Sequence, residues 1–163
     1  MFDFFLTFIP RAIIQGTPLL YGSTGETLTE KSGNLNLGIP GIMYVGAISG
    51  VIGAFYYESS LPGPEAFSGA LAVAITLGAN LLGSLLMGLL YCFLTVTLRA
   101  NQNVTGLAMT TFGVGFGNFF GGSLIKLSGN EMPYLALNRT SLAFRTPMPG
   151  ASTTGWFGQL FLL

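Results

Sequence analysis

The chain alternates between long runs without charged residues and short polar links. Uncharged runs cover residues 39–57, 67–98 and 104–124, and a weaker apolar run covers 12–28. A membrane-spanning helix needs about 20 mostly apolar residues, so these four runs predict transmembrane helices. A further apolar run begins at Trp156 and reaches Leu163, after a polar stretch over 128–154. The pattern predicts an all-α, polytopic transmembrane helix bundle with about four complete spans and the start of a fifth.

Two of these runs depart from a simple span. The run over 67–98 is longer than one perpendicular crossing, so this helix is expected to be strongly tilted, to protrude, or to contain a broken turn. The run over 12–28 contains Gln15 and Pro18 among several Thr, Ser and Gly residues. We expect such a helix to face protein or a watery cavity more than lipid.

Composition supports a lipid environment and excludes several classes of protein. Only 7% of the residues are charged, against roughly 25% in ordinary soluble domains. Half of the residues are hydrophobic, and the mean hydropathy is +0.65. Intrinsic disorder requires the opposite balance, and six scattered cations cannot form the basic stripe of a nucleic-acid binder. Membrane lipid is therefore the expected surrounding, and no nucleic-acid partner is expected.

Residues that carry catalytic or metal chemistry are scarce. The chain has no histidine, one cysteine (Cys92) and one aspartate (Asp3), which excludes Ser-His-Asp triads, HExxH zinc sites and aspartyl dyads. Residues 25–32 read GETLTEKS, but a phosphate-binding loop needs glycine where Glu30 stands. Glu26 and Glu30, four residues apart, share one helix face; we expect a solvated helix end there rather than an intramembrane catalytic pair. The chain is predicted to have no catalytic residue, cofactor or metal.

Small residues recur at intervals of four within the apolar runs. Such ladders let helix backbones approach closely in lipid, and sliding of helices during a transport cycle is the functional alternative. The residues predicted to pack helices together are Gly46, Gly50, Gly113, Gly117 and Gly121.

Two polar segments interrupt the runs. Residues 33–41 read GNLNLGIPG, a mixture that disfavours a regular helix. Irregular backbone at membrane depth is tolerated where it lines a cavity or is buried in protein, so Asn34 and Asn36 either border a translocation path or belong to an interfacial loop. Residues 99–106 read RANQNVTG and are either a solvated loop or a second polar wall of a cavity.

The same two segments carry a resemblance to a known family. Residues 25–46, GETLTEKSGNLNLGIPGIMYVG, resemble the N-terminal part of bacterial ABC-importer permeases of the simple-sugar and nucleoside group. Residues 94–106, LTVTLRANQNVTG, resemble a second segment of that family, in the same order and at similar spacing. The resemblance covers about residues 12–125. Pro40 stands where the family usually has an acidic residue.

The resemblance implies a multi-pass permease subunit in the bacterial plasma (inner) membrane. Its implied partners are an ABC ATPase subunit, which hydrolyses ATP, a second permease subunit and an extracytoplasmic substrate-binding protein. Nucleosides are the preferred solutes, followed by simple sugars. The positions that match the family motif are the candidate substrate path: Asn34, Asn36, Gly38, Asn101, Gln102 and Thr105.

Length and orientation follow from the same resemblance. Family permeases are about twice as long, so the loop that couples to the ATPase is expected beyond Leu163, and truncation, a frameshift or a split gene would account for the difference. If the segment from Trp156 runs inward to that loop, residues 125–154 lie outside, and Lys31 and Arg99 lie inside. A small non-catalytic integral membrane scaffold subunit of a larger complex is the alternative.

Overall fold

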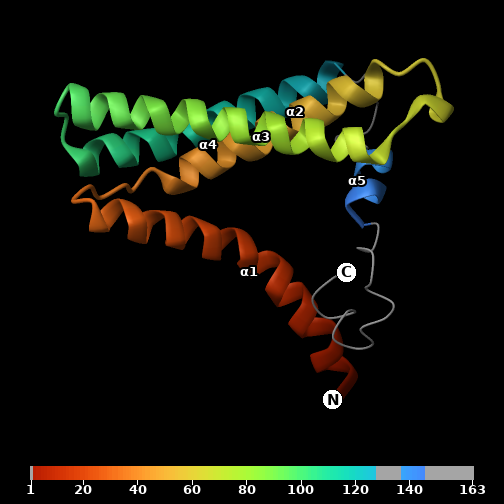
Figure 1. The fold of residues 1–163 in the computed structure, drawn as a ribbon, viewed down its shortest axis with the longest axis horizontal. Helices are drawn as coiled ribbons and strands as arrows, with labels where there is room; N and C mark the ends of the chain where they lie inside the picture. The colour runs from red at the N-terminus through yellow and green to blue at the C-terminus, as the bar shows by residue number, and fades with distance from the viewer. Residues whose placement is uncertain (1, 128–136, 146–163) are drawn as a thin grey trace.

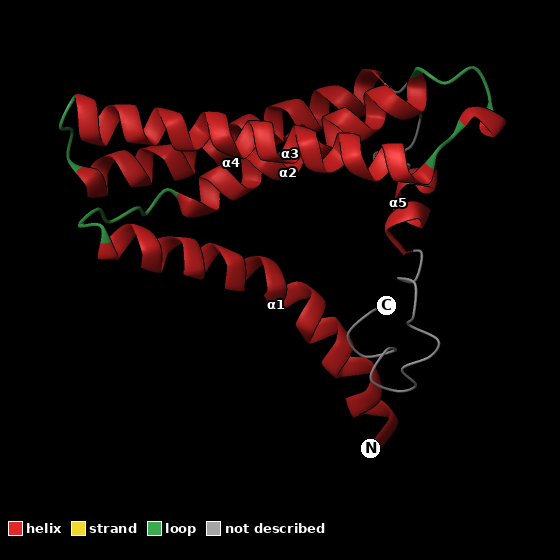
Figure 2. Ribbon diagram, viewed as in Figure 1, coloured by secondary structure: helices red, strands yellow, loops and turns green. Residues whose placement is uncertain are grey.

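The computed structural model describes residues 2–127 and 137–145. Within these ranges the regular structure is entirely helical, which confirms the expected all-α class. Figures 1 and 2 show the helices and the loops that join them. The apolar run expected to begin at Trp156 lies outside the described residues. The α-helices are α1 (Phe2–Lys31), α2 (Ile39–Ser59), α3 (Gly69–Cys92), α4 (Gln102–Leu127) and α5 (Asn138–Arg145).

Helix α1 extends well beyond the weak apolar run over 12–28. It contains Pro10 and Pro18 in its interior, where each proline removes one backbone hydrogen bond and favours a bend. Figure 1 shows α1 bending away from the other helices toward its N-terminal end. Only its C-terminal part therefore lies beside α2, where Met43 approaches Gly22.

The long uncharged run over 67–98 forms a helix that changes type near its end. After α3 the backbone continues as a π-helix over Phe93–Thr97, closed by a bond from the Leu98 N–H to the Phe93 carbonyl at 3.1 Å. Together they form a 29-residue helix, about 43 Å long at 1.5 Å per residue. That exceeds a hydrocarbon core of about 30 Å, so the helix must tilt or protrude when it crosses a bilayer.

Helix α2 is the centre of the bundle and packs against both α3 and α4. Its small residues allow this: a Cβ on Gly46 would lie 2.8 Å from the Asn80 side chain of α3, and one on Gly50 would lie 3.2 Å from the Thr76 carbonyl. On the other side, a Cβ on Gly113 of α4 would lie 2.6 Å from the Cα of Gly41. Glycine is thus required where these backbones cross.

The other two glycines of the α4 ladder also face α2. A Cβ on Gly117 would collide with the ring of Tyr44, and one on Gly121 would meet Ile48 at 3.6 Å. The ladder Gly113, Gly117 and Gly121 therefore faces one helix along its whole length, and at Gly113 it is the backbone of that helix that lies close.

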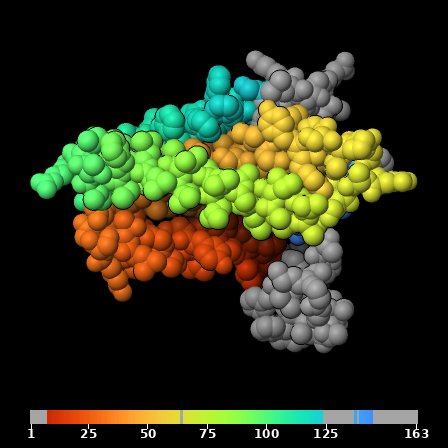
Figure 3. All heavy atoms as spheres, turned by 45° about the horizontal axis from the view of Figure 1, so that its top comes forward, coloured from red at the N-terminus to blue at the C-terminus, as the bar shows by residue number. Residues whose placement is uncertain are grey.

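The buried core is small and most large apolar side chains face outward. Val45, Met87, Tyr91 and Met109 form the core, whereas Leu81, Leu82 and Leu86 of α3 are 61–69% exposed. A surface of this kind suits hydrocarbon rather than water. By length and composition, α2 and the helix Gly69–Thr97 could each cross a membrane within the described part of the chain. Figure 3 shows α1 running alongside the body that the other helices form.

Helix α5 is attached to the far end of α2. The backbone N–H of Thr140 donates to Glu58 Oε1 at 2.7 Å, and the Thr140 hydroxyl donates to the same oxygen. Because the free N–H groups of a helix start favour a carboxylate, Glu58 holds the first turn of α5 against the bundle. This contact lies at the end of the bundle opposite the link between α1 and α2.

Candidate functional site

The link between α1 and α2 is an irregular segment over residues 32–38 (SGNLNLG). Helix α1 ends with bonds from the Gly33 N–H to the Glu30 carbonyl at 2.9 Å and from the Asn34 N–H to the Thr29 carbonyl at 3.1 Å. Gly33 has φ +87°, a left-handed conformation that glycine adopts without strain. The glycine predicted to disfavour a regular helix is therefore the residue that ends α1.

Side chains from three helices bind the backbone of this segment. The Leu35 N–H donates to Gln102 Oε1 of α4 at 2.8 Å, and the Tyr91 hydroxyl of α3 donates to the Leu35 carbonyl at 2.7 Å. The Asn36 N–H donates to Glu26 Oε1 of α1 at 2.8 Å. The Thr110 hydroxyl of α4 donates to the Leu37 carbonyl at 2.8 Å. Backbone groups without helical partners are thus satisfied inside the protein.

The two asparagines of the link shape it from within. Asn34 Oδ1 accepts a hydrogen bond from Gln102 Nε2 at 2.9 Å, so Gln102 bonds both the backbone and a side chain of the segment. Asn36 is 7% exposed, and its Oδ1 accepts the Gly38 N–H at 2.9 Å. This local turn directs the chain into α2, which has Pro40 in its first turn, where its missing N–H costs nothing.

The start of α4 forms the other half of the junction. Asn101 caps the helix, because its Oδ1 accepts the N–H groups of Asn103 at 3.0 Å and Val104 at 3.2 Å. Thr105 is 8% exposed one turn later. Gly106 approaches the link closely: a Cβ there would lie 2.7 Å from the Leu37 nitrogen.

The fold therefore gathers the predicted substrate-path residues at one end of the bundle. Gln102 bonds both the Asn34 side chain and the Leu35 N–H. Gly38 lies close to α4, since a Cβ on it would be 3.0 Å from the Cβ of Met109. Asn101 is exposed at the rim and Thr105 is buried in α4. The hydrogen bonds among these residues hold this end of the bundle together. Only the donors and acceptors that are not already used in these bonds could contact a solute. We use the name polar junction for three parts together: the link 32–38, Tyr91 of α3, and residues 101–110, which comprise the cap and first turns of α4.

The environment of Glu26 differs from the solvated helix end that the sequence predicts. Glu26 was expected at a solvated helix end, yet it is half-buried: Oε1 accepts the Asn36 N–H, and Oε2 is buried without a hydrogen-bond partner. The reason is the link itself, which folds back along the last turns of α1 and covers the carboxylate. Glu30, one turn later, remains exposed as expected. The i, i+4 spacing places both glutamates on one helix face and does not indicate which of them is buried.

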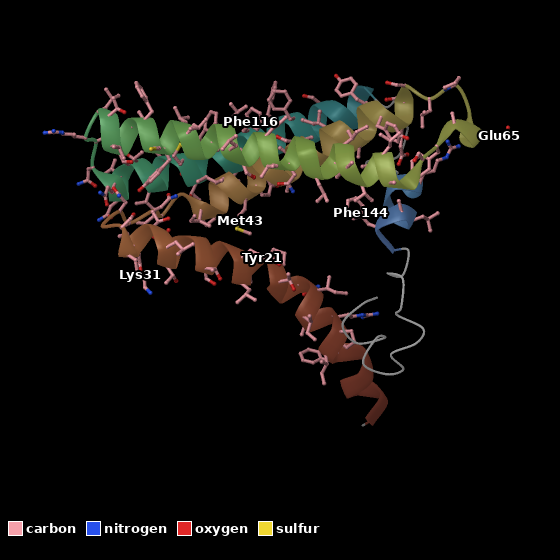
Figure 4. All side chains as sticks on the ribbon, viewed as in Figure 1. Tyr21, Lys31, Met43, Glu65, Phe116 and Phe144 are labelled. Atoms are coloured by element: carbon pink, nitrogen blue, oxygen red, sulfur yellow. The ribbon has the colours of Figure 1, made fainter. Side chains whose placement is uncertain are left out.

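A cavity of about 640 Å³ lies between α1 and the first half of α2, next to the polar junction. Figure 4 shows Met43 pointing from α2 toward α1. Glu26, Glu30 and Asn36 border the cavity at the junction end, and most of the remaining lining is apolar. Representative lining residues are Leu19, Gly22, Ile39, Pro40, Met43 and Ala47. Among the described residues, no group of three His, Cys, Asp or Glu side chains could hold a metal ion.

Curated relatives are transporter permeases. A putative glucose ABC transporter permease of Haloferax volcanii is 30% identical over 119 residues, covering 73% of this chain and 32% of the relative. A guanosine ABC transporter permease of Bacillus subtilis is 25% identical over 153 residues, covering 94% and 44%. A nucleoside ABC transporter permease of Lactococcus lactis is 31% identical over 115 residues, covering 68% and 33%. The chain thus spans less than half the length of each.

A family model matches most of the chain. No solved structure matches the chain significantly. The model described as "Branched-chain amino acid transport system / permease component" matches residues 8–148, which include most of α1, all of α2 to α4 and the polar junction. The names of the relatives agree with the resemblance found in residues 25–46 and 94–106, and that resemblance is confirmed. Because the match covers most of the chain, the protein belongs to this family of membrane permease components.

Proposed function

We propose that the chain is a membrane-spanning permease subunit of an ATP-driven ABC importer for nucleosides or simple sugars. The observation that carries the proposal is the family match over residues 8–148, which includes the polar junction. The relatives named for guanosine, nucleosides and glucose support this choice of solutes.

ATP hydrolysis is assigned to a separate ABC ATPase subunit. The one sequence that resembles a phosphate-binding loop, residues 25–32, lies in the last turns of α1 and its cap. Helical backbone there directs its N–H groups along the helix axis, so they cannot cradle a phosphate as a P-loop does. A second permease subunit and an extracytoplasmic substrate-binding protein complete the proposed assembly.

The proposed membrane arrangement has α1 to α4 as the spans, within about 12–28, 39–57, 67–98 and 104–124, in a bacterial inner membrane. The link 32–38 and the turn 98–101 lie at one end of the bundle, while Glu65 lies at the other (Figure 4). Lys31 and Arg99 stand at the junction end and agree with a cytoplasmic side there, whereas Arg11, Lys126, Arg139 and Arg145 fall on the other side, so the count of cations favours the reverse orientation. The proposed orientation follows from the inward run expected of the segment from Trp156. The proposal puts the polar junction at the cytoplasmic end.

Solute contacts are proposed at the polar junction. Carriers bind solutes where helices are interrupted, because backbone and amide groups at such breaks can face the solute. Asn34, Asn36, Gly38, Asn101, Gln102 and Thr105 combine amide groups with irregular backbone over 32–38. Their internal bonds make this a preorganised wall of the path rather than a set of freely moving side chains.

Uptake in living cells tests the proposed function. Cells that lack the gene for this chain should lose energy-dependent accumulation of tritiated guanosine or of labelled glucose, and a plasmid copy of the gene should restore it. Depleting ATP should abolish the restored uptake. Uptake of both solutes at the same rate with and without the gene would contradict the proposal.

A further inference from the structure

The cavity between α1 and α2 has the size and lining of a small-molecule site. Its volume of about 640 Å³ lies within the range of about 300–1,000 Å³ that ligand pockets occupy. Leu19, Ile39, Met43 and Ala47 supply an apolar wall, and the polar junction closes one end. Ligand pockets commonly combine such walls with a few fixed polar groups.

Glu26 supplies the fixed polar group. Its Oε1 is held by the Asn36 N–H at 2.8 Å, which orients the carboxylate, and its Oε2 is buried without any hydrogen-bond partner. A buried polar atom that lacks a partner costs free energy. Glu26 lines the cavity, so a ligand that donates an N–H or O–H to Oε2, once the carboxylate turns toward it, would remove this cost.

The balance of apolar and polar lining selects between solute classes. A sugar carries hydroxyl groups on all sides, and each one buried against the aliphatic wall without a partner would be unfavourable. A nucleoside has a flat base that can lie against Ile39 and Met43, while its N–H groups or ribose hydroxyls can donate to a carboxylate. Two carboxylates line the cavity: Glu30 is exposed, whereas Glu26 is half-buried and oriented by the Asn36 N–H.

We propose that this cavity binds a nucleoside and that Glu26 Oε2 accepts a hydrogen bond from it. The inference rests on the proposed importer function and narrows its solute to one class. It adds Glu26, together with the α1–α2 cavity, to the residues of the polar junction.

Binding to the purified full chain in lipid nanodiscs tests the inference without the ATPase. The probe is tritiated guanosine, measured by scintillation proximity. Glu26→Gln keeps an oxygen for the Asn36 N–H but puts an NH₂ group where Oε2 lies. Loss of a charge-assisted hydrogen bond should weaken guanosine binding to Glu26→Gln by about tenfold or more.

The matched control is Glu65→Gln, the same change on an exposed residue at the opposite end of the molecule. It should bind guanosine as the wild type does.

A second variant separates loss of the site from loss of the fold. Ala47→Phe enlarges an exposed side chain on the cavity wall, so it should block guanosine without touching Glu26. Unchanged thermal unfolding of both variants shows that the fold is intact. Guanosine binding that is equal in the wild type, Glu26→Gln and Ala47→Phe would overturn the inference, as would a wild type that binds no guanosine or that glucose displaces equally well. These results leave the uptake test of the importer function unaffected.

Discussion

At the scale of single residues, the polar junction replaces helical hydrogen bonds with side-chain ones. Gln102 bonds both the Leu35 N–H and the Asn34 side chain, while Tyr91 and Thr110 satisfy the carbonyls of Leu35 and Leu37. A donor or acceptor that stays buried after losing its partner costs free energy. The side chains of this junction are therefore structural requirements as well as candidate solute contacts.

Gln102→Leu should destabilise the protein by about 1–3 kcal/mol, because it leaves the Leu35 N–H and the side-chain Oδ1 of Asn34 without these partners. The matched control is Gln15→Leu on the exposed surface of α1, where no hydrogen bond is lost and stability should hold or rise slightly. Thermal unfolding in detergent measures both. Equal stability of the two variants would show that the Gln102 bonds do not brace the link.

The same substitution at two glycines of the α1 region should have opposite effects. Gly33→Ala forces a side chain into a left-handed conformation at φ +87° and should cost about 1–2 kcal/mol. Gly25→Ala lies in the helix with nothing within 4 Å of the new Cβ, and it should stabilise by about 0.5–1 kcal/mol. Chemical denaturation read by circular dichroism gives both values. Shifts of the same sign would contradict the assigned end of α1.

The residues of the junction were partly predictable. Asn34, Asn36 and Gln102 stood out because amides beside apolar runs need partners, and their motifs matched a family. Their pairing across 68 residues was not predictable, because no periodicity within one segment reports a contact between two. Glu26 was missed for the same reason: its burial depends on a link that folds back over it, whereas sequence spacing alone suggested a solvated face.

At the scale of elements, the uncharged runs predicted where the central helices lie but not their form. Ile39–Ser59 follows the run over 39–57 closely, because Gly38 and Pro40 mark its start. The length of the run over 67–98 allowed for a broken turn, but the position of the π-helix over Phe93–Thr97 was not predictable, since FLTVT contains neither glycine nor proline. Helix α1 continues past Pro10 and Pro18 because membrane helices tolerate proline when neighbouring groups satisfy the freed carbonyls.

The crossing of α2 and α4 depends on one close approach. Gly113→Ala would place a Cβ 2.6 Å from the Gly41 Cα, a backbone atom that cannot move aside alone, and overpacking of this kind costs about 1–3 kcal/mol. Gly115→Ala, on the same helix, meets nothing within 4 Å and should be neutral or slightly stabilising. Thermal unfolding of the two variants compares them directly. A neutral Gly113→Ala would show that α2 and α4 do not cross there.

At the scale of the whole molecule, the apolar side chains face outward and the polar junction closes one end. Leu81, Leu82 and Leu86 are 61–69% exposed in the middle of the long helix Gly69–Thr97, and the core they surround is small. Such an arrangement is stable only when hydrocarbon covers the outer face. Membrane embedding is therefore the claim on which the fold, the junction and the cavity all depend.

Labelling of two exposed positions tests that claim most directly. With Cys92→Ala as background, Leu82→Cys lies in the middle of the long helix and Arg99→Cys lies at the junction; both positions are exposed in the structure. In native membranes opened to both sides, a charged maleimide should modify Arg99→Cys within minutes and leave Leu82→Cys unmodified, because the membrane keeps water and the charged reagent away from the latter. Both should react after denaturation in detergent. Rapid labelling of Leu82→Cys in intact membranes would contradict the account.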